Sequence, residues 1–126
     1  KTVRKIMKDL YKAEPAGLSG NEDCGQMSSW FVLNAMRIYS FSPGSTEFQI
    51  GSPIFNEIKI DVGSDKTFTI KAINNSQKNI YIQIAKLNGK DYKSTGLEYF
   101  DIMKGGELIL KMGNKPNNKW FNENGN

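Results

Sequence analysis

Side chains that could bind water, a proton or a cation gather in one short segment, residues 19–31, which reads SGNEDCGQMSSWF. Asn21, Glu22 and Asp23 follow one another there, and Gln26 comes three positions after Asp23. A carboxylate can take a proton from water as a general base, and carboxylate and amide oxygens bind hard cations. Glycines on both sides of the three residues give the backbone freedom to hold a carboxylate at a cleft. The segment is therefore a candidate half of an active site.

The same residues also fit a purely structural interpretation, the start of a helix. Asp23 and Gln26 have the spacing of a capping box, in which each side chain bonds the backbone N–H of the other residue, and Glu22 would suit the positive end of the helix dipole. A calcium-binding EF-hand is excluded, because the glutamate that such a loop requires would fall at Val32. The sequence leaves open whether Asp23 is a catalytic base or a helix cap.

Composition limits the classes of protein to which this chain can belong. Its 126 residues suit one domain, and a content of 38% hydrophobic and 24% charged residues is typical of a folded protein. The net charge of +4 comes from lysines scattered along the chain, which does not favour a nucleic acid as partner. No apolar run approaches the length of a membrane span, and the charged N-terminal stretch does not resemble a signal peptide.

Cysteine and histidine usage narrows the possible chemistry. The single cysteine, Cys24, has no internal partner for a disulfide, and we expect it to be a small buried side chain. The absence of histidine removes the commonest general base and the commonest metal ligand, so any metal must be held by oxygen atoms. The chain begins at Lys1, without methionine and inside a helical pattern, and we therefore expect it to be a piece of a longer protein.

Two helices are predicted in the first third of the chain. Apolar residues recur at helical spacing in residues 2–12, and residues 26–40 are apolar over more than half of a helix circumference. A proline and several glycines between these segments predict a loop. We interpret Trp30, Phe31 and Met36 in the second helix as packing residues rather than as a platform for a sugar.

Alternation of apolar and polar residues replaces the helical pattern in the rest of the chain. It predicts short strands at residues 46–51, 57–62, 66–73, 80–87 and 107–112. The second and third of these should form a hairpin, and the Asn88–Gly89 pair should form a tight turn. Strands and helices do not alternate, so we expect antiparallel pairing. The predicted fold class is α+β, with two N-terminal helices followed by an antiparallel β-sandwich-like segment.

Several stretches of the chain carry a resemblance to a known enzyme family. They read GNEDCGQMSSW from Gly20 to Trp30, IGSPIF from Ile50 to Phe55, and, in the closing part, NGK, DIMKGGELILKMG and KPNNKW. Together they cover nearly the whole chain. On these residues the sequence resembles the C-terminal part of glycoside hydrolase family 92, the calcium-dependent, exo-acting α-mannosidases.

The resemblance implies a place for this chain in the architecture of that family. Family members have a catalytic domain built on an (α/α)6 barrel of helices, and their chain ends in a β-rich segment. Residues 1–45 would then be the last helices of the barrel, including the loop from Asn21 to Gln26. Residues 46–126 would be the C-terminal antiparallel β segment. The two predicted helices would thus be a remnant of the barrel.

The resemblance also implies a reaction, the hydrolysis of terminal α-mannosides such as α-1,2-linked mannose with inversion of configuration. The general acid of the family lies outside this chain, so the chain alone is expected to be inactive. The matching motif places the general base on Asp23 and gives Asn21 the role of orienting the attacking water. Glu22 and Gln26 are expected to contact the substrate or to support residues that do, although Glu22 could instead belong to a buried ion pair. Calcium is the expected cofactor, with its ligands unassigned.

One alternative is a non-catalytic β-sandwich that binds carbohydrate or serves as a scaffold. Under either interpretation, the expected partners are mannose-containing glycans and the rest of the parent catalytic domain. Helix faces that have lost their barrel neighbours also predict a homodimer of this chain. The family suggests a periplasmic, cell-surface or secreted location.

Overall fold

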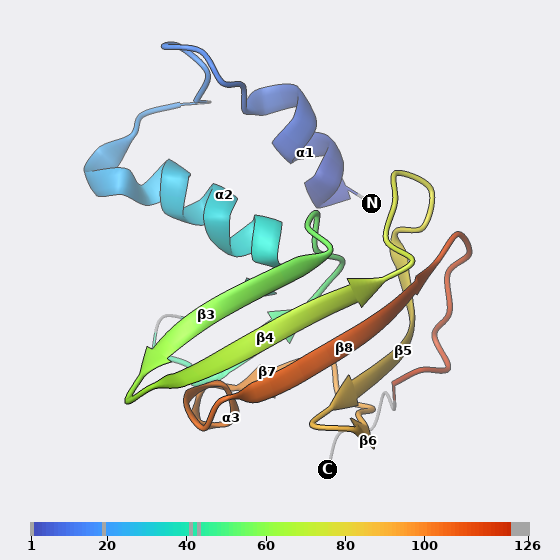
Figure 1. Cartoon of the computed structure of the whole chain (residues 1–126). Coiled ribbons are helices and arrows are strands. Elements are labelled where there is room, and N and C mark those ends of the chain that lie inside the picture. Colours follow the sequence, from blue (N-terminus) through green and yellow to red (C-terminus); the bar gives the residue numbers. More distant parts are fainter. Residues whose placement is uncertain (1, 19, 41, 43, 122–126) are drawn as a thin grey trace.

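The computed structural model describes residues 2–18, 20–40, 42 and 44–121. The predicted first part, residues 1–45, and the predicted second part, residues 46–126, therefore each include positions outside the described residues. Two helices lie together on one side of the molecule, and a twisted five-stranded sheet forms the other side (Figure 1). This arrangement confirms the predicted α+β fold class.

The helical part contains α1 (Thr2–Leu10), a short 3-10 helix η1 (Asp23–Gly25) and α2 (Gln26–Met36). The predicted first helix is confirmed, and its apolar stripe buries Met7. The second helix ends at Met36, four residues earlier than predicted. Arg37 adopts a left-handed conformation with φ 61°, and its N–H bonds back to the carbonyl groups of Leu33 and Asn34. A left-handed residue at this place ends a helix and turns the chain away.

A small three-stranded sheet follows the helices. Its strands are antiparallel in the order β1-β2-β7, with the bounds β1 (Ile38–Tyr39), β2 (Glu47–Ile50) and β7 (Gly96–Glu98). Strand β2 was predicted, whereas β1 and β7 were not, because two or three residues are too few to display an alternating pattern.

A larger sheet contains the other strands in the order β3-β4-β8-β5-β6. The bounds are β3 (Glu57–Gly63), β4 (Lys66–Ile73), β5 (Tyr81–Leu87), β6 (Lys90–Asp91) and β8 (Gly106–Gly113). The predicted β3–β4 hairpin is confirmed, and the Asn88–Gly89 turn joins β5 to β6. Strand β8 pairs antiparallel with β5 but parallel with β4, so the sheet is mostly antiparallel. The short helix α3 (Tyr99–Met103) precedes β8.

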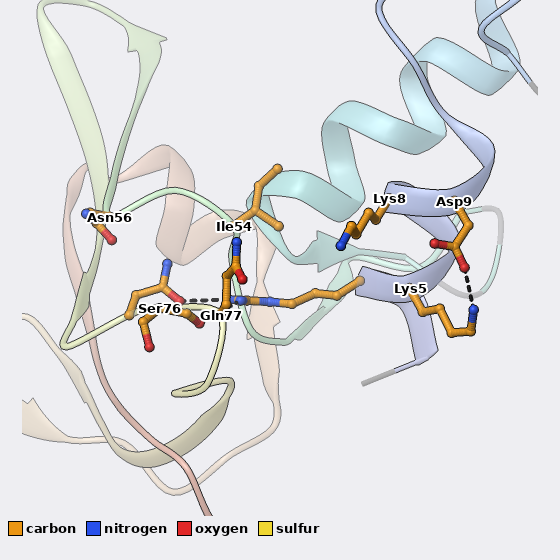
Figure 2. A pocket seen from close by; sticks show the side chains of 9 residues that line it. Lys5, Lys8, Asp9, Ile54, Asn56, Ser76 and Gln77 are labelled. Carbon is orange, nitrogen blue, oxygen red and sulfur yellow. Dashed lines mark hydrogen bonds and ion pairs between the residues drawn. The ribbon is translucent and has the colours of Figure 1, made fainter.

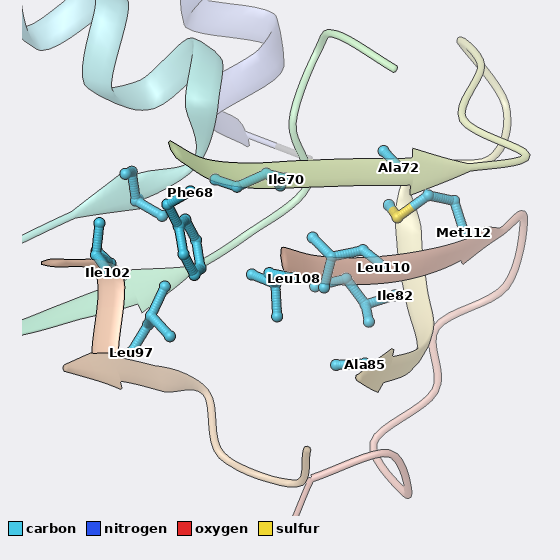
Figure 3. Close-up of a cluster of buried hydrophobic side chains, with 11 residues drawn as sticks. Phe68, Ile70, Ala72, Ile82, Ala85, Leu97, Ile102, Leu108, Leu110 and Met112 are labelled. Atoms are coloured by element: carbon cyan, nitrogen blue, oxygen red, sulfur yellow. The ribbon is translucent and has the colours of Figure 1, made fainter. Parts of the chain in front are cut away.

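The two sheets share one hydrophobic core (Figure 3). Alternate residues of β4 and β8 point into it, and Phe68 and Leu108 are completely buried. Leu97 of β7 and Ile38 of β1 reach the same core from the smaller sheet. The buried members are Ile38, Phe68, Ile70, Ala72, Ile82, Ala85, Leu97, Ile102, Leu108, Leu110 and Met112. The β part is therefore sandwich-like, with one continuous interior between its sheets.

Candidate functional site

The loop that holds the predicted site residues enters α2 through a tight turn. Cys24 and Gly25 are both left-handed, with φ 52° and φ 78°, and they follow Asp23 in the short helix η1. A left-handed conformation strains any residue other than glycine, so the conformation of Cys24 must be held by its surroundings. Asn21, Glu22, Asp23 and Gln26 are all exposed in this chain.

The predicted capping box is wrong, because a different acidic residue covers the helix end. The N-cap position of α2 is Gly25, which has no side chain to offer. Both carboxylate oxygens of Glu22 lie 3.2 Å from the backbone N–H of Ser28, which donates to them in the first turn of α2. The turn at Cys24 and Gly25 folds the chain back, so that Glu22, rather than Asp23, reaches the helix terminus. Glu22 then also faces the positive end of the helix dipole.

Asp23 therefore has a free carboxylate within the described part of the chain. Its backbone carbonyl accepts a hydrogen bond from the N–H of Gln26, whereas its side chain makes no hydrogen bond or ion pair with any described residue. The neighbouring Asn21 side chain is likewise without a partner among these residues. Glu22 forms no ion pair in the described chain, so the buried ion pair considered for it is not formed here. The loop thus presents a carboxylate and an amide that are free to bind water.

Cys24 is exposed, contrary to the expectation of a buried side chain. Cys24 lies in the short helix η1 with φ 52°, in the turn before α2 rather than within that helix, which accounts for the difference. Small apolar residues are usually buried, but a strained turn overrides that tendency.

A cluster of three aromatic rings lies close to the loop that holds Glu22. Tyr11, just after α1, stacks on Trp30 with ring centroids 5.4 Å apart and lies 5.2 Å from the ring of Phe31. Burial raises the pKa of the Tyr11 phenol, and the nearby charge of Glu22 raises it further. Trp30 and Phe31 are thus packing residues, as predicted. Sequence reasoning missed the role of Tyr11, although it continues the apolar stripe of α1.

The described residues do not assemble a metal centre by themselves. No group of three or more Asp, Glu, Cys or His side chains in the described ranges could hold a metal ion. The oxygens of Glu22 are already engaged by Ser28. The loop from Asn21 to Gln26 therefore does not fit calcium without further oxygen ligands.

Two of the hollows on the helical side of the molecule border the β part, and none of the predicted site residues lines either of them. The larger, of about 640 Å³, lies between α1 and the loops around Ile54 and Ser76 (Figure 2). Figure 2 shows the ion pair of Lys5 and Asp9 at its rim, together with the amine of Lys8, which forms no ion pair with any described residue. The smaller hollow, of about 310 Å³, is lined by α2, β2 and residues beside them. Sequence reasoning missed both hollows, because no periodic pattern indicates where separate elements leave space.

None of the helices within the described ranges has the length and apolar character needed to cross a membrane. The longest of these helices is α2, with 11 residues, whereas a span needs about 20.

Comparison with known proteins identifies the family. The model of the glycosyl hydrolase family 92 catalytic domain matches residues 1–114. An uncharacterized secreted glycosidase of Arthroderma benhamiae is 35% identical over 107 residues, which cover 82% of this chain and 14% of that protein.

Solved structures from Bacteroides thetaiotaomicron give the same result. A family GH92 inverting mannosidase superimposes with a TM-score of 0.85 at 36% identity. A family GH92 α-mannosidase in complex with mannoimidazole superimposes with a TM-score of 0.86 at 39% identity. The match covers 94% of this chain but 16% of each of those chains, so this chain spans about one sixth of their length. The chain belongs to glycosyl hydrolase family 92.

Proposed function

We propose that this chain is the C-terminal part of an inverting exo-α-mannosidase and that Asp23 is its general base. The family match and the mannosidase neighbours support a mannosidase as the parent protein. In this proposal α1 and α2 are the last helices of an (α/α)6 barrel, and mannose-containing glycans such as α-1,2-mannosides are the substrates. The β part serves as a scaffold, because its exposed large side chains on β4 and β5, Ile73 and Ile84, are aliphatic rather than aromatic.

The proposal rests on a difference in hydrogen bonding between the two neighbouring carboxylates. Glu22 is occupied by the N–H of Ser28 at the start of α2, and Asp23 is left without a side-chain partner in the described residues. A helix cap would need the reverse arrangement. The free, exposed carboxylate of Asp23 beside the free amide of Asn21 can accept a proton from water, and the amide can orient that water.

An inverting mechanism assigns a definite task to each group. The base and the acid of such an enzyme stand about 6.5 to 9.5 Å apart, which leaves room for a water molecule between the base and the anomeric carbon. Asp23 would remove a proton from this water as it attacks, while an acid from outside this chain protonates the departing oxygen. Without the opposing acid, this chain alone is inactive.

Calcium remains part of the proposal only for the parent protein. The coordination of the ion would be completed by oxygen ligands from outside this chain, since the described loop does not form a calcium site alone. No step assigned to Asp23 or Asn21 depends on the ion. Glu22 and Gln26 would act by supporting the loop or by contacting the sugar.

The test is release of mannose from α-1,2-mannobiose by the full-length parent. Asp23→Asn should lower turnover by about three orders of magnitude or more while the protein stays folded, because the base is lost and the shape is kept. Asp65→Asn is the matched control, since Asp65 is exposed in the β3–β4 turn and the same atoms change. The anomer released first, read by NMR, should be inverted, and a chelator should abolish activity.

A rate for Asp23→Asn that equals the rate of the Asp65→Asn control would contradict the assignment of the base. If Glu22→Gln instead caused the large loss, with an unchanged melting temperature, Glu22 would be the base. A parent that releases no mannose from any α-mannoside would leave the non-catalytic alternative, binding or scaffolding, as the function.

A location outside the cytoplasm is proposed for the parent, namely the periplasm, the cell surface or the medium. The support is the description of the Arthroderma benhamiae relative as a secreted glycosidase. Fractionation of the source cells with an antibody against the parent tests this, and recovery only in the cytoplasmic fraction would contradict it.

A further inference from the structure

Two arginines in this chain carry charges that no described carboxylate neutralises. Arg4 of α1 donates hydrogen bonds to the carbonyl groups of Pro53 and Ser76 and, over 2.7 Å, to Oδ1 of Asn75. All three acceptors are neutral. The Nε of Arg4 is buried and has no partner among the described residues. Six ion pairs occur in the described chain, and none involves Arg4 or Arg37.

The backbone conformation of Arg37 is unusual for a residue with a long side chain. Its left-handed backbone, φ 61°, ends α2 at a position that glycine favours. The guanidinium lies against Gly51, where an added Cβ would come within 2.4 Å of the Arg37 Nε. The N–H of Gly51 also donates to the Arg37 carbonyl over 2.9 Å. A strained backbone and a matching space for the side chain together indicate that the guanidinium has a functional role.

The segment from Gly51 to Pro53 connects the two arginines. Arg37 lies on its first residue, Arg4 bonds its last, and the hydroxyl of Ser52 between them is buried without a partner in the described chain. Burial lowers the pKa of Arg37, and the charge of Arg4 lowers it further. The two cations are therefore close enough to repel each other, and every unsatisfied group here can donate a hydrogen bond.

The side chain of Arg37 also faces a hollow. It lines the hollow of about 310 Å³, whose other lining residues, including Asn34 and Gln49, carry no charge. The adjoining strand β2 carries one acidic residue, Glu47. Its carboxylate already accepts a hydrogen bond from the side-chain amide of Gln49 over 2.8 Å. Half-buried charges without a counter-ion are costly, and guanidinium groups pair best with carboxylates, through two parallel hydrogen bonds.

We propose that this hollow receives an aspartate or glutamate side chain from the part of the parent protein outside this chain, which pairs with Arg37. The positive charge of Arg4, which acts on Arg37, adds to the attraction for a carboxylate. The source of the carboxylate follows from length, because this chain covers 16% of the solved relatives and most of the parent lies elsewhere. The inference rests on membership in a longer family 92 protein and not on Asp23 as the base.

The test compares two changes to glycine in the full-length parent. Arg37→Gly and Ser64→Gly both relieve a left-handed backbone, and Ser64, with φ 53°, lies exposed in the β3–β4 turn. Ser64→Gly should raise the melting temperature slightly, since glycine is at ease there. Arg37→Gly should lower it by about 2 °C or more, because the carboxylate loses its partner. Mannosidase activity is not the readout, so failure here leaves the assignment of Asp23 untouched.

A rise in melting temperature for Arg37→Gly equal to that for Ser64→Gly would overturn the proposal. Stabilisation of the unmodified parent by sulfate or phosphate over chloride at equal ionic strength, absent in Arg37→Gly, would also overturn it by identifying a free anion as the occupant. If Arg37→Gly does not fold, Arg37→Lys and Arg37→Met replace it. A carboxylate partner predicts that Arg37→Lys is the more stable of the two, and equal stability would refute it.

A double-mutant cycle then identifies the partner. Each Asp or Glu near the hollow in the parent is changed to its amide, alone and with Arg37→Met. The partner is the residue whose change costs stability in the unmodified parent and little in Arg37→Met. Additive effects for every acidic residue in reach would contradict the proposed ion pair.

Discussion

The sheet part and the helical part of this chain differ in how much buried apolar interior they form. Phe68, Leu97 and Leu108 in the sheets are 0% exposed. In the helical part, Leu10 and Val32 remain 49% and 52% exposed. The sheets thus enclose a hydrophobic core of their own, although Ile73 and Ile84 remain exposed on their strands. Among the described apolar residues of α1 and α2, Met7 and Ala35 alone are buried. We therefore expect the β part to keep its fold when the helices are disturbed, and we expect the helices to need cover from other sequence.

The proposed functional groups lie in the helical part. Asp23 stands at the start of α2 and Arg37 at its end, on the side of the molecule where the helices lie (Figure 1). An exo-acting glycosidase needs an opposing acid and a pocket, which the rest of the barrel would complete. In the proposed mannosidase, the sheets would therefore supply stability, and the helical part would supply groups for a reaction that the rest of the parent completes.

The largest expected effect tests whether the sheet core holds this chain together. Phe68→Ala removes a completely buried ring between the two sheets and should lower the free energy of unfolding by about 3 to 5 kcal/mol. Urea unfolding followed by circular dichroism measures the change. Ile84→Ala is the control, because Ile84 is 44% exposed and its truncation should cost much less. Equal costs for the two variants would contradict a self-sufficient sheet core.

A second prediction concerns the attachment of α1 to the sheet part. Arg4→Met removes the hydrogen bonds to the loop oxygens of Pro53, Asn75 and Ser76 and should cost about 1 to 3 kcal/mol. The loss should be local, so amide hydrogen exchange should speed up in α1 and stay unchanged in β8. Lys8→Met on the same helix is the control, since its amine makes no ion pair in the described chain. Faster exchange throughout β8 would show that the two parts unfold as one.

Local patterns predicted the elements that depend on neighbouring residues. The β3–β4 hairpin and the Asn88–Gly89 turn follow from alternation and turn chemistry, and both are confirmed. The place of β8 between β4 and β5 could not be predicted in this way. Alternation tells which face of a strand is buried, whereas the neighbour of a strand is chosen by contacts between distant residues.

The loop before α2 illustrates the limit for the site. Sequence spacing assigned the cap to Asp23, but the left-handed pair Cys24 and Gly25 delivers Glu22 to Ser28 instead. Only the backbone angles reveal this exchange. The early end of α2 has the same cause, because a positive φ at Arg37 is not expected of a long side chain. Both misses occur where strained residues lie next to the proposed functional groups.

A third prediction sharpens the contrast at the exposed surfaces. We propose that the isolated chain forms a homodimer through the apolar surface around Leu18, Phe31 and Val32, which line one hollow. Val32→Lys should weaken the dimer about tenfold or more, because a charge would be buried at its centre. Ile73→Lys is a matched control, since Ile73 on β4 is also 52% exposed. Light scattering over a range of concentrations measures the effect, and a monomer at every concentration would refute the dimer.

The smallest effect tests a polar link within the sheet part. The Tyr92 hydroxyl donates over 2.7 Å to the carbonyl of Gly96, the first residue of β7. Tyr92→Phe should therefore cost about 1 kcal/mol at neutral pH. Burial raises the Tyr92 pKa above the ordinary value of 10.0, and the charge of Asp101 raises it further. The folded chain therefore retains this proton more strongly than the unfolded chain, and the stability that it adds is present below pH 10 and lost as the pH rises through the folded pKa.

Ultraviolet titration of the phenols and urea unfolding from pH 8 to pH 11 check this prediction. The unmodified chain should lose stability above pH 10 more steeply than Tyr92→Phe, because the phenylalanine ring has no proton to lose. Tyr99→Phe on the exposed α3 should follow the unmodified chain. If Tyr92→Phe and the unmodified chain had the same slope, the Tyr92 hydroxyl would be in contact with water, and the sheet part would be more open at this edge than its buried core implies.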